Sequence, residues 1–237
     1  MNFLTKIKQK FTKSTAEKQI SERPYRFRIF KDIPHFSVRT NSSKLTIVNV
    51  STTGLAVESS VIKSISGELV PLVFSINGEE FGMNAKVVRQ TDDLTALTYE
   101  DPSPGFVSSF LRFLEIERKS VALTPVDSAT INRSAYTGDV AWYRGGKNDE
   151  LFYSYSPGVI HYLQAQTTGF LFESSEGAPR VGKLKKSGDD NAYSPWLLTE
   201  AQAQDAKEIF GRYFENIKGL PDEHRGLLNV LLRQIKV

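Results

Sequence analysis

Six short runs of strand-forming residues follow one another between residues 35 and 100, and no other feature constrains the fold as strongly. The runs are HFSVRT, KLTIVNV, GLAVES, ELVPLVFSI, EEFGMNAKVVRQ and LTALTYE. Turn-forming sequences separate them, among them Asn77-Gly78, a pair that tolerates the positive φ values of a tight hairpin. Strands this short and closely spaced predict a small antiparallel barrel or sandwich.

A helix is predicted directly after the last of these strands, over DPSPGFVSSFLRFLEIE. Pro102 and Pro104 precede its apolar part. The large apolar residues fall on one helical face and are Phe106, Phe110, Phe113 and Leu114. We expect this face to close an open end of the barrel.

The first 31 residues are strongly basic, with nine lysines and arginines against two glutamates. Apolar residues recur there at helical spacing: Phe3, Leu4, Ile7 and Phe11. Two interpretations remain open. Residues 1–18 either form a basic amphipathic helix on an anionic membrane surface, or they are a solvated terminus or a helix packed on the protein body.

The stretch NVSTTGLAV, residues 49–57, lies between the second and third predicted strands. Asn49 and Ser51 are two residues apart, so they project to the same face of a regular strand. Gly54 is expected to adopt a backbone conformation that a β-carbon would resist. Polar residues in such a turn either bond their own backbone or face a ligand.

Arginines lie just upstream, in ERPYRFRIF, before the first predicted strand. An arginine cluster followed by Asn-x-Ser-x-x-Gly between barrel strands resembles the PilZ domain, over roughly residues 22–117. The resemblance implies a six-stranded antiparallel β-barrel with a closing helix, and binding of the bacterial second messenger cyclic di-GMP. The ligand-binding residues that it implies are Arg23, Arg26, Arg28, Asn49, Ser51 and Gly54.

The chemistry of these residue types suits such a ligand. Arginine can fork onto a phosphate or onto the acceptor edge of guanine, and asparagine or serine can bond a base edge. The arginine spacing departs from the Arg-x-x-x-Arg pattern of the family, because the residue four before Arg28 is Pro24. Two functions therefore stay open: a cyclic di-GMP-responsive signalling protein, and a nucleotide-independent adaptor that binds a protein partner.

The sequence of residues 139–237 predicts an α+β region that ends in two helices. VAWYRGGKNDELFYSYS and GVIHYLQAQTTGFLFES each predict two strands, and RVGKLKK a further one. Thr199 and Gln202 form a predicted capping box at the start of the first helix, and a leucine-rich second helix follows Pro221. The predicted divisions are a basic segment 1–21, a barrel 22–118, a linker 119–138 and an α+β region 139–237.

Catalytic signals are absent from the sequence. The three histidines share no ligand spacing, and neither a nucleophile motif nor a phosphate loop occurs. Asp139, Asp149 and Glu150 are not paired by their spacing. The chain has no cysteine, which excludes disulfides and thiolate metal sites. The sequence therefore predicts a protein without enzymatic activity, cofactor or metal. Enzymatic activity in the C-terminal region is a third function, ranked behind the two above, because a catalytic set assembled only in three dimensions leaves no sequence motif.

Charge and hydropathy limit which partners and which compartment we expect. The net charge of +3 gives no reason to expect a specific nucleic-acid partner, although aromatic residues beside basic ones in AWYRGG could stack nucleobases. No apolar run approaches the roughly 20 residues of a membrane helix. We expect a cytoplasmic bacterial protein that binds cyclic di-GMP, a protein partner, or both.

Overall fold

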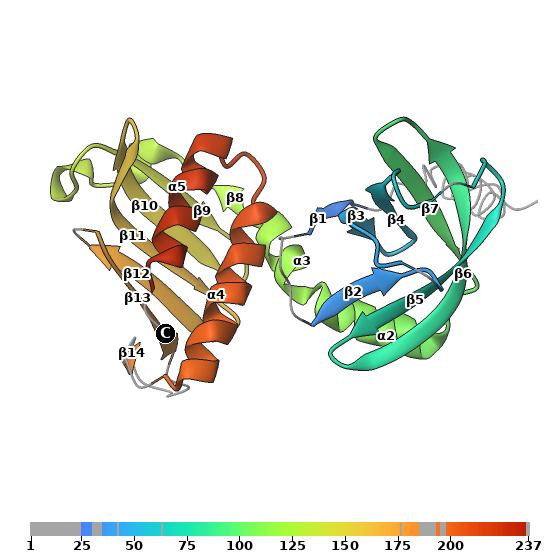
Figure 1. The fold of residues 1–237 in the computed structure, drawn as a ribbon. Helices are drawn as coiled ribbons and strands as arrows, with labels where there is room; N and C mark the ends of the chain where they lie inside the picture. Colours follow the sequence, from blue (N-terminus) through green and yellow to red (C-terminus); the bar gives the residue numbers. More distant parts are fainter. Residues whose placement is uncertain are drawn as a thin grey trace, which may run out of the picture.

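The computed structural model describes residues 25–29, 35–41, 43–62, 64–175, 177–184, 193–194 and 198–235. Two antiparallel sheets, each with its own buried cluster, lie side by side and are joined through helices (Figure 1). Arg23 and the membrane interpretation of residues 1–18 lie outside the described residues. Among the described residues, no helix combines the length and apolar character that a membrane span requires.

The N-terminal sheet has seven strands in the order β1-β3-β4-β7-β6-β5-β2. They are β1 (Phe27–Arg28), β2 (Phe36–Arg39), β3 (Ile47–Ser51), β4 (Gly54–Glu58), β5 (Leu69–Ile76), β6 (Glu79–Gln90) and β7 (Leu94–Glu100). The six predicted strands are β2 to β7, which confirms the small antiparallel sheet, and β1 adds a seventh. At the turn between β5 and β6, Asn77 and Gly78 both have positive φ, 51° and 85°, as expected for a tight hairpin.

The sheet curls until its edge strand β2 meets the residues that lead into β3. Arg39 of β2 forms an antiparallel bridge with Lys44. The Leu45 N–H donates to the Val38 carbonyl at 2.8 Å. These contacts join distant ends of the sheet order and give it the form of a partly closed barrel.

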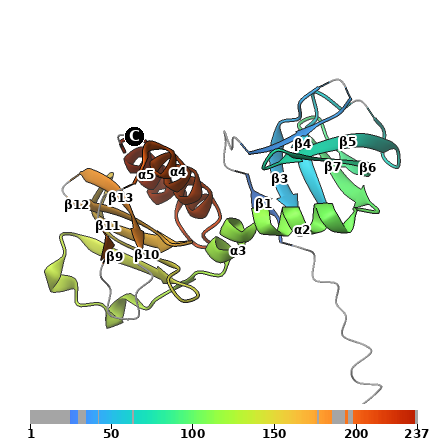
Figure 2. The same ribbon diagram turned by 90° about the horizontal axis from the view of Figure 1, so that it is seen from below.

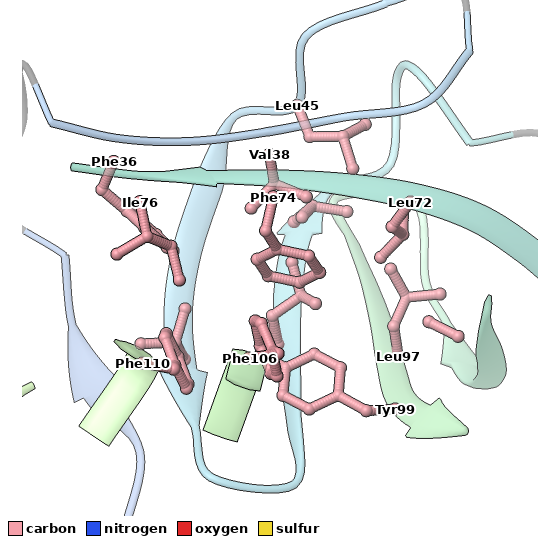
Figure 3. Close-up of a cluster of buried hydrophobic side chains, with 14 of the residues drawn as sticks. Phe36, Val38, Leu45, Leu72, Phe74, Ile76, Leu97, Tyr99, Phe106 and Phe110 are labelled. Atoms are coloured by element: carbon pink, nitrogen blue, oxygen red, sulfur yellow. The ribbon is translucent and has the colours of Figure 1, made fainter. Parts of the chain in front are cut away.

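Helix α2 (Pro104–Phe113) closes one end of this barrel. The Ser103 hydroxyl caps the helix by accepting from the Phe106 N–H at 3.2 Å, and Pro104 occupies the first turn, where its missing N–H costs nothing. Figure 3 shows Phe106 and Phe110 of this helix pointing toward Phe74 of β5. The ring centroids of Phe74 and Phe106 are 4.9 Å apart, and the predicted closing face is buried.

The C-terminal sheet is a meander whose strands lie side by side in sequence order. It comprises β8 (Thr124–Pro125), β9 (Asp139–Arg144), β10 (Glu150–Ser156), β11 (Val159–Thr167), β12 (Phe170–Ser175), β13 (Ala178–Leu184) and β14 (Tyr193–Ser194). Two short 3-10 turns, η1 (Ser128–Thr130) and η2 (Arg133–Ala135), follow β8. The segment predicted as a linker, 119–138, thus contains one strand of this sheet.

Two helices cover one face of this sheet, α4 (Glu200–Glu215) and α5 (Asp222–Arg233) (Figure 1). Both halves of the predicted capping box form, because the Thr199 hydroxyl accepts from the Gln202 N–H and the Gln202 side chain accepts from the Thr199 N–H. Phe210 and Phe214 of α4 pack against Phe172 of the sheet. The predicted α+β region with two terminal helices is therefore confirmed.

Helix α3 (Glu115–Val121) joins the two domains (Figure 2). Ile116 packs against the buried cluster of the C-terminal domain, whereas Val121 packs against that of the barrel. The guanidinium of Arg212 in α4 donates to both carboxylate oxygens of Glu117, at 2.7 and 2.8 Å, and also to the Phe113 carbonyl. The end of α2 and helix α3 are thereby bonded to α4.

Candidate ligand-binding face

Arg28 of β1 lies directly opposite Asn49 of β3, on neighbouring antiparallel strands. Their strand neighbours Phe27 and Val50 belong to the barrel core, so Arg28 and Asn49 face outward. The N–H and carbonyl of Arg28 bond Asn216 rather than β3. Arg28 and Asn49 therefore form the kind of pair that lacks mutual backbone hydrogen bonds, in which opposed side chains lie closest.

Arg26 directly precedes β1. The register that pairs Phe27 with Val50 and Arg28 with Asn49 places Arg26 opposite Ser51 when it is extended by one residue. Arg26 is exposed, and Arg28 keeps 63% of its side chain exposed. Arg26, one residue before β1, and Arg28 of β1 are thus two exposed arginines two residues apart in the chain, and Asn49 lies opposite Arg28 on the next strand.

Ser51 and Gly54 shape the turn between β3 and β4. The Ser51 hydroxyl donates to the Gly54 carbonyl at 3.1 Å and accepts from the Thr53 N–H at 3.3 Å, and Ser51 is only 6% exposed. Of the two interpretations of this turn, the first therefore applies to Ser51: its hydroxyl bonds the backbone of the turn itself.

The prediction that Gly54 adopts a backbone conformation that a β-carbon would resist is wrong. Gly54 lies outside the positive-φ region, so its backbone conformation does not require glycine. A β-carbon there would instead lie 2.1 Å from the Leu97 carbonyl oxygen of β7. Gly54 is needed because β4 and β7 approach closely, which is a packing constraint that a sequence motif alone does not reveal.

The C-terminal domain also reaches Arg28. The Asn216 side chain, at the end of α4, accepts from the Arg28 N–H at 2.8 Å and donates to the Arg28 carbonyl at 3.0 Å. Asp222, the first residue of α5, lies 3.9 Å from the Arg28 guanidinium and also pairs with Arg225. Lys218 lies between these two positions in the chain, and its ammonium stands 4.9 Å from the centre of the Tyr25 ring.

A shallow pocket of about 470 Å³ lies elsewhere on the barrel, lined by Ser59, Ser60, Ile62, Gln90, Thr91 and Asp92. Ser59 follows β4 at the end away from the β3–β4 turn, so the pocket is separate from the arginine face. Apart from Ile62, its lining offers hydroxyl, amide and carboxylate groups, without a cation. Such a lining does not suit a dianionic ligand, whereas the exposed Arg26 and Arg28 do.

Two of the three carboxylates considered for catalysis have structural partners. Asp149 accepts from the Thr167 hydroxyl at 2.8 Å, and Glu150 accepts from the Trp142 indole and the Gln166 amide. Within the described residues, no group of three or more histidines and carboxylates could hold a metal ion.

Tyr153 and Tyr213 are fully buried in the C-terminal core. Desolvation raises the pKa of Tyr153 and of Tyr213 well above the usual tyrosine range, so both phenols stay protonated at neutral pH. The Tyr153 hydroxyl is 2.8 Å from His224 Nδ1.

No protein-family model matches the sequence, and no curated protein matches it. Solved structures that are similar include an uncharacterised Legionella protein, at 18% identity over 40% of this chain and 98% of that one, with a TM-score of 0.32. The PilZ domain of CeSA from a cellulose-synthesizing bacterium matches at 21% identity over 33% of this chain and 85% of that domain, with a TM-score of 0.26. PlzA of Borreliella burgdorferi, solved in complex with c-di-GMP, matches at 13% identity over 85% of this chain and 99% of PlzA, with a TM-score of 0.31. PilZ proteins are thus among the structures similar to this chain.

Proposed function

We propose that the protein binds cyclic di-GMP on the outer face of β1 and β3 and acts as a signalling protein of the PilZ type. The observation that carries this proposal is the direct pairing of Arg28 with Asn49 on that face. Both residues belong to motifs whose order and type resemble those of PilZ domains. They lie 21 positions apart in the sequence, and the strand register makes them neighbours.

The face offers the groups that a cyclic dinucleotide needs. Two exposed arginines, Arg26 and Arg28, can fork onto phosphates or onto the N7 and O6 acceptors of guanine. The amide of Asn49, a half-buried residue, supplies both a donor and an acceptor for a base edge. Ser51 and Gly54 contribute by holding the turn that follows Asn49.

Binding at this face would act on the contact between the two domains. A phosphate that bonds the Arg28 guanidinium competes with Asp222, which belongs to the C-terminal domain. Because Asn216 of the same domain bonds the Arg28 backbone, a ligand on Arg28 is linked to both domains. Any change that the ligand makes in this contact is reciprocal, so the contact in turn alters ligand affinity.

The alternative is a nucleotide-independent adaptor that binds a protein partner. One observation favours it: the Arg28 guanidinium already has a carboxylate 3.9 Å away within the chain. Pro24, at the position where the family has its first arginine, is consistent with this alternative. Under it, the outer face of β1 and β3 would contact protein rather than nucleotide.

Calorimetric titration of the full chain with cyclic di-GMP separates the two functions. We expect saturable binding, and a loss of about 1.5–3 kcal/mol of binding free energy in Arg28→Ala, the cost of one charge-assisted hydrogen bond. Arg89→Ala is the matched control, because Arg89 is an exposed arginine on β6, separated from β3 by β4 and β7. If no binding heat appears at high micromolar nucleotide, the adaptor function is supported instead. Equal losses in the two variants would place the nucleotide elsewhere.

A further inference from the structure

Asn216 occupies an unusual place for a buried polar residue. It is 3% exposed and ends α4, yet its side chain bonds the backbone of a strand in the other domain. Its Oδ1 accepts from the Arg28 N–H at 2.8 Å and its Nδ2 donates to the Arg28 carbonyl at 3.0 Å. Only this orientation of the amide satisfies both backbone groups, since a flipped amide would oppose donor to donor and acceptor to acceptor.

These two bonds replace a missing strand. β1 has two residues, pairs with β3 on one side and ends the sheet on the other. The N–H and carbonyl of Arg28 point to that open side, where a neighbouring strand would offer one acceptor and one donor. The Asn216 amide offers the same two groups, so Arg28 is bonded on the open edge of β1.

Asn216 is itself fixed by the junction between the domains. Its Nδ2 also donates to the Arg212 carbonyl at 3.3 Å. The Arg212 side chain is bonded to Glu117 of α3. A series of buried polar contacts therefore runs from α3 through α4 to the backbone of Arg28.

We propose that Asn216 is a positioning residue for the ligand-binding arginine, a role that rests on the function proposed above. By fixing the backbone of Arg28, Asn216 keeps the guanidinium beside Asn49 before the ligand arrives. A guanidinium on a strand bonded on one side only would lose part of its binding free energy in becoming ordered. The C-terminal domain thus contributes to nucleotide affinity through a residue that does not touch the nucleotide.

A double-mutant cycle tests this role, with cyclic di-GMP affinity measured by calorimetry. Asn216→Leu is expected to weaken binding by about tenfold in the wild-type background. In the Arg28→Ala background, the backbone bonds remain but the guanidinium is gone, so the same substitution should change affinity by less than about twofold. A merely structural loosening would weaken binding equally in both backgrounds.

Two further variants provide a milder substitution at position 216 and a matched control. Asn216→Asp retains an acceptor for the Arg28 N–H and loses the donor, so its loss of affinity should be smaller than that of Asn216→Leu, and it replaces the latter if that protein does not fold. Asn229→Leu is the matched control, since Asn229 is a half-buried asparagine of α5 that bonds Glu215 and not β1. We expect Asn229→Leu to leave affinity unchanged.

Amide hydrogen exchange supplies a readout that needs no nucleotide. The Arg28 N–H should exchange about tenfold faster in Asn216→Leu than in the wild-type protein, because its acceptor is gone. Unchanged exchange, unchanged affinity, or equal effects in the two backgrounds of the cycle would each overturn the role of Asn216 while the proposed function stands. If the wild-type protein binds no cyclic di-GMP, the proposed function fails and the role of Asn216 fails with it.

Discussion

The guanidinium of Arg212 and the carboxylate of Glu117 form a buried ion pair with two hydrogen bonds, between helices that are 95 residues apart in the chain. Glu117 is fully buried and Arg212 is 5% exposed. The guanidinium also stands 4.2 Å from the centre of the Phe113 ring. A charge in such a place is tolerated only with its partner, so the pair ties α3 to α4.

Arg212→Met should destabilise the protein by about 3–5 kcal/mol, because it leaves the Glu117 carboxylate buried without a partner. Urea unfolding followed by circular dichroism measures the loss. Lys119→Met is the control, since Lys119 pairs with Glu115 on the helix surface, where such a pair is worth about 0.3–0.5 kcal/mol. Similar losses in the two variants would mean that the buried pair is no more important than the exposed one.

Gly54→Ala should destabilise the barrel by about 1–3 kcal/mol or more, because the new β-carbon would meet the Leu97 carbonyl oxygen and force β4 away from β7. Gly82→Ala is the matched control: Gly82 also lies in a strand of this sheet, and its β-carbon would meet no atom within 4 Å. We expect it to change stability by no more than about 0.5 kcal/mol. Thermal unfolding compares the variants, and equal melting temperatures would contradict the close approach.

Ser51 and Asn49 should differ in what their alanine variants lose. Ser51→Ala removes the hydroxyl that bonds Gly54 and Thr53, so it should cost about 0.5–1.5 kcal/mol of stability. Asn49→Ala should keep its melting temperature and lose about fivefold to tenfold in cyclic di-GMP affinity. Thermal unfolding and calorimetry on both variants check the division, and the reverse pattern would refute it.

Asp222→Asn should raise nucleotide affinity, because Asp222 competes with the phosphate for Arg28. The two side chains are 63% and 86% exposed, so the gain should not exceed about fivefold and should shrink at high salt. Glu223→Gln, the next residue of α5, is the control for the loss of one negative charge. Equal gains in the two variants would indicate a general charge effect rather than competition at Arg28.

Glu208 gives stability a pH dependence of known sign. Desolvation raises the pKa of its carboxyl in the folded protein, and attraction to Arg212 lowers it by less. The folded state therefore binds more protons than the unfolded state just above the ordinary value of 4.5, so the Glu208 contribution to stability falls as pH rises through its raised pKa. Glu208→Gln should flatten this part of the stability profile. Melting temperatures from acidic to neutral pH test it, with Glu100→Gln as the exposed control, and a profile unchanged in Glu208→Gln would count against it.

The barrel strands β2 to β7 could be predicted because each is a local pattern, a β-branched or aromatic run between turn residues. β1 could not, because its two residues become a strand only by pairing with β3. The motif order likewise pointed to Arg28 and Asn49, but only the register shows that they are neighbours. The reason for a glycine at position 54 was predicted wrongly, because the close approach of β7 depends on how the sheet curls.

The residues of the domain junction gave weaker signals. Asn216 follows the helix predicted after Thr199, and an asparagine at a helix end is ordinary, so its bonds to another domain could not be foreseen. Arg212 gave no usable signal either, because its helix-face neighbours Glu208, Glu215 and Asn216 are polar, as on an ordinary exposed face. Contacts that span most of the chain have no local pattern from which to predict them.

The hydrogen bonds between Arg28 and Asn216 span 188 residues, which sets the order in which the ligand face is completed during synthesis. β1 and β3 leave the ribosome early, together with the residues proposed to meet the nucleotide. At 5–20 residues per second, the codon for Asn216 is translated about 10–40 s after that for Arg28. A nascent chain can thus hold a folded barrel whose Arg28 is still bonded on one side only. If Asn216 positions Arg28, full nucleotide affinity is acquired only when translation has passed α4, so a prematurely terminated protein would signal poorly even with an intact barrel.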